Sequence, residues 1–94
     1  MLWFRKKYVL DGYRFTDKQA AHKYIAETLK FPDYYGNNLD ALADCLSEMK
    51  KRTRITITNC DYIIDSLGNY GKSIIDIFQQ QGNEFELEII IKND

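Results

Sequence analysis

Residues 53–58 read Thr-Arg-Ile-Thr-Ile-Thr, and this alternation of β-branched residues is typical of a β-strand. Helical patterns stand on both sides of this strand. One covers residues 38–50 with Asn38 as its cap, and the other covers residues 70–82 with Gly82-Asn83 as its end. A strand enclosed by helices favours parallel pairing, because parallel neighbours need a crossover connection.

The rest of the chain extends the same alternation of strands and helices. Pro32 separates the first two helices, because the residue before a proline is disfavoured in helical geometry. The further expected elements are a strand over residues 3–10 that turns at Asp11-Gly12, a helix over residues 17–30 capped by Thr16, a short helix at residues 63–67 and a strand over residues 85–91. This order predicts an α/β fold, with a small three-stranded parallel sheet packed with about four helices.

Length and charge restrict the class of protein. The chain has 94 residues, 45% of them hydrophobic, and its formal net charge is −1. A chain of this length is expected to form one domain, residues 1–94, because domains commonly have roughly 100–150 residues. Its near-neutral charge provides no general attraction to nucleic acid or to an anionic membrane.

Cysteine usage and the N-terminus favour a cytoplasmic protein. The two cysteines, Cys45 and Cys60, form neither a CxxC pair nor a metal-ligand pattern, so reduced thiols are expected. At the N-terminus the apolar residues precede the basic ones, which is the reverse of a signal peptide. Apolar runs such as Ile89-Ile90-Ile91 are far shorter than the ~20 residues that span a bilayer.

Acidic residues are concentrated in one segment. Residues 31–49 contain no lysine or arginine and four acids, which are Asp33, Asp40, Asp44 and Glu48. The last three recur at steps of four, so they share one face of the second helix. An apolar stripe occupies roughly the opposite face and consists of Leu39, Leu42, Leu46 and Met49. A solvated helix face is one interpretation of the acidic stripe, although such faces normally also carry lysines.

The sequence provides no arrangement of residues typical of an enzyme. His22, the only histidine, lies beside the apolar stripe of the first helix and is expected at the surface. Asp40 and Asp44 both face solvent in this interpretation, which gives no means of separating their pKa values for acid–base work. A helical stripe also spreads carboxylates along its length instead of converging them on a metal ion. We therefore expect a binding protein with no cofactor and no metal.

The basic run Lys50-Lys51-Arg52-Thr53-Arg54 has two interpretations. It could contact phosphate, with Tyr34 or Tyr62 stacking on bases, as in a small RNA-binding protein. The interpretation we favour is the solvated C-terminal end of a helix, where cations complement the helix dipole.

The segment Phe31-Pro32-Asp33-Tyr34-Tyr35-Gly36-Asn37-Asn38-Leu39-Asp40-Ala41-Leu42-Ala43-Asp44 carries a resemblance to a known family. It resembles the barstar-like family, whose type member is the intracellular inhibitor of the secreted ribonuclease barnase. Weaker likeness extends over essentially the whole chain. The resemblance implies a three-stranded parallel sheet packed with helices, and an inhibitory surface formed by residues 33–49. The family's acidic helix and loop plug the basic active site of the nuclease.

The resemblance also implies roles for individual residues. Asp44 would take the place of a substrate phosphate against catalytic Arg and His groups, and Asp40 would engage neighbouring polar or cationic groups. Tyr34 would pack against a catalytic histidine, while Gly36 and Asn38 would shape the loop and the helix start. The full set of expected ribonuclease-binding residues is Tyr34, Gly36, Asn38, Asp40, Ala43, Asp44, Ser47 and Gln80.

Three departures from the family pattern bear on the partner. Ala43 and Met49 stand where barstar has tryptophans, and Gln80 replaces an acid on the last helix. We expect these changes to weaken or redirect binding to barnase itself, and we expect a monomer that forms a 1:1 complex with a barnase-like extracellular ribonuclease. The alternative is a barstar-like module that binds a different basic partner, such as a toxin without ribonuclease activity.

Overall fold

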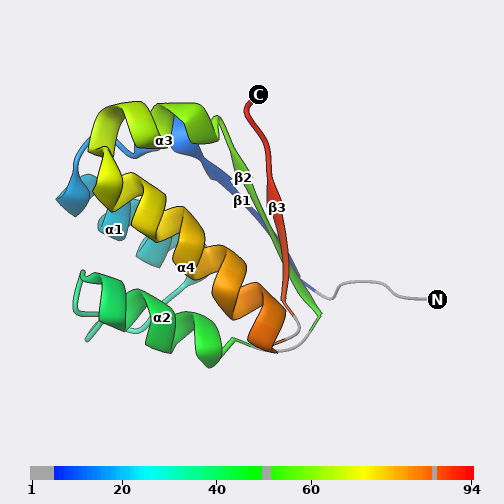
Figure 1. Ribbon diagram of the computed structural model, residues 1–94. Coiled ribbons are helices and arrows are strands. Elements are labelled where there is room, and N and C mark those ends of the chain that lie inside the picture. The colour runs from blue at the N-terminus through cyan, green and yellow to red at the C-terminus, as the bar shows by residue number, and fades with distance from the viewer. Residues whose placement is uncertain (1–5, 50–51, 86) are drawn as a thin grey trace.

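The computed structural model describes residues 6–49, 52–85 and 87–94, and for residues 83–85 it describes the backbone only. In chain order the elements are β1 (Lys6–Asp11), a 3₁₀ turn (Gly12–Arg14), α1 (Lys18–Leu29), α2 (Leu39–Ser47), β2 (Thr53–Thr58), α3 (Cys60–Leu67), α4 (Asn69–Phe85) and β3 (Glu88–Ile91). The α/β architecture with a three-stranded sheet and four helices is confirmed (Figure 1).

The sheet has the order β1-β2-β3, and both pairings are parallel. Tyr8 pairs with Ile55 and Ile55 with Ile89, so β2 is the central strand. Each crossover contains two helices and moves one strand further in the same direction. Right-handed crossovers in the same direction place their helices on the same face of a sheet, and Figure 1 shows the helices gathered on one side.

The burial of β2 follows this two-layer arrangement. Thr53, Ile55 and Ile57 are buried, while the residues between them are only half-buried, since their side chains lie on the face without helices. The core fills the space between the sheet and the helices. Its fully buried large side chains include Leu10, Phe15, Ile25, Leu42, Leu46, Ile63, Ile74 and Phe78. At about 25 cal/mol per Å² of apolar surface, burial of such side chains is the main favourable contribution to folding.

The structure corrects the boundaries of α1. Its N-cap is Asp17, not Thr16, because the Asp17 carboxylate accepts a hydrogen bond of 2.8 Å from the backbone N–H of Ala20. At the other end, Lys30 adopts a left-handed conformation with φ of 60°, and its N–H donates to the carbonyl of Ala26. The helix therefore ends at Leu29, before the loop that contains Pro32 begins.

The C-terminal part of the chain differs most from the predicted boundaries. α4 does not end at Gly82-Asn83 but continues to Phe85, and β3 begins at Glu88 instead of at residue 85. Gly82 is buried, and a Cβ built on it would lie 2.6 Å from Cγ1 of Ile89. The glycine thus permits close packing of α4 on β3, which is a different role from ending a helix.

Four smaller differences concern the other elements. The first strand runs over Lys6–Asp11, and the residues predicted before it lie outside the described part of the chain. α2 ends at Ser47 instead of near residue 50, and α3 starts at Cys60 instead of residue 63. Within the basic run, Thr53 and Arg54 belong to β2 and not to the end of a helix, and residues 50–51 lie outside the described part of the chain. The Arg54 side chain forms a salt bridge with Glu88 of β3, with 2.8 Å between Nε and Oε1.

Candidate protein-binding site

The loop between α1 and α2 points one tyrosine outward and the next inward. Tyr34 is 81% exposed, whereas Tyr35 is 8% exposed and packs within the core. The Tyr35 N–H donates a 3.0 Å hydrogen bond to the carbonyl of Pro32, which closes a turn around these residues. The loop therefore presents the Tyr34 ring to solvent from a backbone that is fixed next to it.

Asn38 joins this loop to α2. Its side-chain oxygen accepts a 2.8 Å hydrogen bond from the N–H of Ala41, which confirms the predicted N-cap. Its side-chain amide donates to the carbonyl of Gly36 at 3.2 Å. The one side chain thus fixes both the exposed Gly36 backbone and the start of the helix.

α2 has two chemically distinct faces. Leu42 and Leu46 are completely buried, and Leu39 and Met49 pack against the core beside them. Asp40, Asp44 and Glu48 are exposed, and we call these three residues the acidic ridge. The predicted separation into an apolar and an acidic stripe is therefore confirmed.

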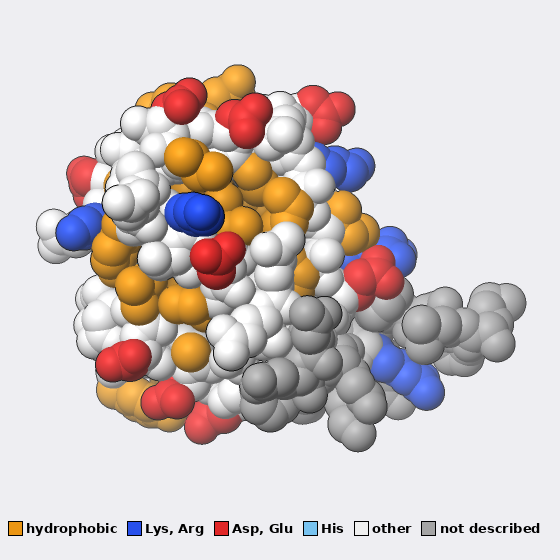
Figure 2. Space-filling view, in the orientation of Figure 1, with side chains coloured by type: hydrophobic (Ala, Val, Ile, Leu, Met, Phe, Trp, Pro, Cys, Tyr) orange, Lys and Arg blue, Asp and Glu red, His pale blue; other side chains and the backbone are white. Residues whose placement is uncertain are grey.

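The acidic ridge is not neutralised within the described part of the chain, where none of its carboxylates forms an ion pair with a lysine or arginine. Asp40 lies in the first turn, where the helix dipole favours a negative charge. Figure 2 shows acidic side chains along the lower edge of the molecule, where α2 lies in Figure 1. Like charges four residues apart cost about 0.2–0.5 kcal/mol per pair, so the ridge is unfavourable for the isolated helix.

The ridge also affects a neighbouring thiol. Burial raises the pKa of the Cys45 thiol, and the negative charges of Glu48 and Asp44 raise it further. Cys45 and Cys60 are both free, and burial likewise raises the pKa of Cys60. A thiol with a raised pKa is a weak nucleophile at neutral pH, so this site does not favour cysteine chemistry.

The remaining predicted site residues lie beside the ridge or on α4. Ala43 is half-buried on α2, and half-buried Ser47 donates a 2.6 Å hydrogen bond from its hydroxyl to the carbonyl of Asp44. Gln80 is exposed on α4, the helix that packs against α2. Seven of the eight predicted residues therefore occupy one continuous loop and helix, and Gln80 is on the neighbouring helix.

The prediction that His22 lies at the surface is wrong. Its side chain is 1% exposed, and both ring nitrogens have tyrosine partners. Nδ1 lies 2.7 Å from the Tyr35 hydroxyl and Nε2 lies 2.6 Å from the Tyr70 hydroxyl. Helical periodicity could not reveal these contacts, because the partners come from the loop and from α4.

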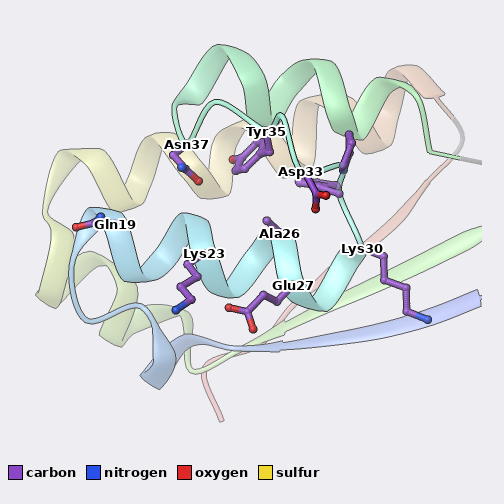
Figure 3. Close-up of a pocket in the computed structure, with 10 residues that line it drawn as sticks. Gln19, Lys23, Ala26, Glu27, Lys30, Asp33, Tyr35 and Asn37 are labelled. Carbon is purple, nitrogen blue, oxygen red and sulfur yellow. The ribbon is translucent and has the colours of Figure 1, made fainter.

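A groove lies between α1 and the loop (Figure 3). Its volume is about 480 Å³, and Phe31, Pro32 and Tyr35 contribute to its lining. Charges of both signs also line the groove, from Lys23, Glu27, Lys30 and Asp33. This mixture of charges does not define one class of small ligand.

The described residues give no indication of a metal centre or of a membrane segment. No group of three or more potential metal ligands occurs among them. Over the same part of the chain, no helix is both long and apolar enough to cross a bilayer.

Comparisons with known proteins find similarity along nearly the whole chain. A family model described as "Barstar (barnase inhibitor)" matches residues 5–90. The chain is also 33% identical over 90 residues to "Putative ribonuclease inhibitor YrdF" from Bacillus subtilis (strain 168), and this alignment covers 93% of the chain and 99% of that protein.

Proposed function

Since the chain belongs to the barstar (barnase inhibitor) family, we propose that it inhibits a barnase-like extracellular ribonuclease by plugging the basic active site of that enzyme. The observation that carries this proposal is the acidic ridge, which consists of the exposed carboxylates of Asp40 and Asp44 on α2 and of Glu48 at its C-cap, while the other face of α2 lies in the core. In this function the chain is not an enzyme. It binds one ribonuclease molecule in the cytoplasm and protects the RNA of the cell that makes both proteins.

The proposed roles follow the order of residues along the loop and α2. Asp44 occupies the position of a substrate phosphate, and Asp40 engages neighbouring cationic or polar groups. The exposed ring of Tyr34 packs on a catalytic histidine, and its fixed backbone lowers the entropy lost on binding. Gly36 and Asn38 preserve the shape of the loop, and Ala43, Ser47 and Gln80 contribute to the edge of the interface.

Long-range electrostatic attraction between the acidic ridge and the ribonuclease gives the first test. The rate of association with the ribonuclease is expected to fall steeply as salt rises, because salt screens long-range attraction, with a Debye length of about 8 Å at physiological ionic strength. Glu48→Gln is expected to lower the association rate and reduce its dependence on salt. Stopped-flow association at several salt concentrations measures both effects, with Asp65→Asn on α3 as the control. Association that does not depend on salt would contradict the proposal.

Ala43 gives a test of the docking geometry. We expect weak inhibition of barnase itself, because Ala43 provides little contact area where tryptophan is among the strongest hot-spot residues. Ala43→Trp is expected to tighten barnase binding, by up to about 30-fold if the ring becomes a hot spot worth about 2 kcal/mol. Titration of barnase activity measures the change, and Ile64→Trp on an exposed position of α3 is the control. Unchanged inhibition would show that α2 docks differently at this position.

A further inference from the structure

His22 is a buried histidine to which the proposed inhibitory contacts assign no role. Its two ring nitrogens lie within hydrogen-bond distance of the hydroxyls of Tyr35 and Tyr70. A neutral imidazole has one N–H donor and one acceptor nitrogen, and a tyrosine hydroxyl can donate or accept. The neutral ring can therefore form both hydrogen bonds at once, donating one and accepting the other.

Tyr35 anchors the loop between α1 and α2 to the core, and we call this loop, residues 30–38, the binding loop. Over residues 33–38 every side chain except that of Tyr35 is exposed. Figure 3 shows the Tyr35 side chain lying between the loop and α1. Because Tyr34 directly precedes it, an inward Tyr35 helps to keep Tyr34 directed toward solvent. An interaction that fixes the Tyr35 hydroxyl therefore also fixes the position of Tyr34, which would contact a partner.

Tyr70 connects the same imidazole to α4. It lies at the beginning of that helix, where Gly71 packs closely on the backbone of α3; a Cβ at Gly71 would be 2.5 Å from the carbonyl oxygen of Ile63. The Lys18 ammonium lies 4.5 Å from the centre of the Tyr70 ring. His22 thus links three separate segments, which are α1, the binding loop and the start of α4.

We propose that His22 is a positioning residue for the binding loop. Through its hydrogen bonds the neutral imidazole keeps Tyr35 packed against α1 and α4, and protonation of His22 in mild acid loosens this packing. The effect on affinity rests on the proposed function, whereas the effect on the loop does not.

The surroundings of His22 disfavour its charged form. Burial lowers the pKa of the imidazole below its ordinary value of 6.5. Burial also raises the pKa of both tyrosines, so neither supplies a negative charge, and the Cys45 thiol, which interacts electrostatically with Tyr35, has a raised pKa as well. Lys18 adds a positive charge near Tyr70. An imidazolium in this position would be buried without a carboxylate bound to either nitrogen.

The direction of the pH effect follows from these values. Between the lowered pKa of folded His22 and 6.5, the unfolded chain binds more protons than the folded chain. The stability that comes from a neutral His22 is therefore present above 6.5 and is lost as the pH falls through the lower, folded-state value. Opening of the loop alone exposes the imidazole to water, so we expect the loop to respond before the whole fold unfolds.

Nuclear magnetic resonance of the free protein tests the positioning role without a partner. The His22 ring is expected to titrate below its ordinary pKa, and the backbone amide signals of Gly36 and Asn38 are expected to shift with the same midpoint. Amides in α3, such as that of Asp65, are the internal control and should not follow it. Signals of Gly36 and Asn38 that ignore the His22 midpoint would overturn the proposal.

Tyr70→Phe tests the consequence for binding, because it removes one hydrogen bond from His22 and leaves the loop sequence unchanged. With barnase as the probe, we expect about 2–10-fold weaker binding above the His22 midpoint, which corresponds to the net loss of one hydrogen bond. Below that midpoint the two proteins should bind barnase with equal affinity, because protonated His22 no longer positions the loop in either of them. The titrations of barnase itself cancel in this ratio. Tyr13→Phe, at an exposed tyrosine, is the matched control.

The outcomes separate this inference from the proposed function. Equal barnase affinity of Tyr70→Phe and the wild type at neutral pH, or an affinity ratio that does not change with pH, would overturn the positioning role. If the wild type fails to bind barnase, the barnase form of the proposed function fails, and the signals of Gly36 and Asn38 still decide whether His22 positions the loop.

Discussion

Asp44→Ala is expected to weaken binding of a barnase-like ribonuclease by about 2–5 kcal/mol, roughly a 30- to 4,000-fold rise in Kd. This is the general range for truncating one partner of a buried interfacial charge pair, a class that includes the barnase–barstar complex. The loss should appear mainly as faster dissociation, because cations of the enzyme are left buried and unpaired. Stopped-flow association and competition-based dissociation rates separate the two components.

Because Asp44 is exposed, this experiment measures the effect on binding separately from any effect on stability. Its side chain lies outside the core, so its removal should leave the free energy of unfolding within about 0.5 kcal/mol of the wild type. Asp65→Ala removes an exposed carboxylate from α3 and is the control, because α3 lies at the other end of the molecule from α2 (Figure 1). An Asp44→Ala protein that inhibits as well as the wild type would rule out the plug mechanism. An activity of the isolated wild type that Asp44→Ala abolishes would instead indicate an enzyme.

Leu46→Ala on the other face of α2 is expected to reduce the free energy of unfolding by about 2–5 kcal/mol, which is the usual cost of removing a fully buried leucine. Leu46 is 0% exposed and belongs to the hydrophobic core, and the helix that carries it packs against α4. Small domains have total stabilities of about 5–15 kcal/mol, so this loss is a large share. Urea denaturation followed by circular dichroism measures it.

The control for Leu46→Ala preserves the volume of the side chain. Leu46→Met is expected to cost less than about 1.5 kcal/mol, because the longer, flexible side chain still fills the site. Equal stability of Leu46→Ala and the wild type would mean that α2 is not packed as described. Together with Asp44→Ala, these variants should show that one face of α2 determines stability and the other determines binding.

The sequence was most informative where the pattern depended on local spacing. The bounds of β2 were predicted correctly, because alternation of β-branched residues over residues 53–58 is a local property. The two faces of α2 and its Asn38 cap were likewise predictable from steps of three and four residues. The resemblance of residues 31–44 then pointed to the family, which the match over residues 5–90 shows.

Features that depend on contacts between distant segments could not be obtained in this way. The burial of His22 requires Tyr35 and Tyr70, which are brought to α1 by the loop and by the packing of α4. The continuation of α4 through Gly82 depends on close approach to Ile89 of β3. In both cases local propensity gave the wrong answer because tertiary packing decided the position of the residue.

The division of α2 into two faces has a consequence for how such inhibitors can diverge. Residues of the acidic ridge are exposed and contribute little to the packing of the core. Substitutions there can therefore accumulate one at a time with little effect on the free energy of unfolding. Under the proposed function, a change in the active site of the enzyme can therefore be matched by substitutions in the acidic ridge that leave the inhibitor folded. Under the proposed function, substitution of a few surface residues of α2 is enough to match the same scaffold to a different ribonuclease.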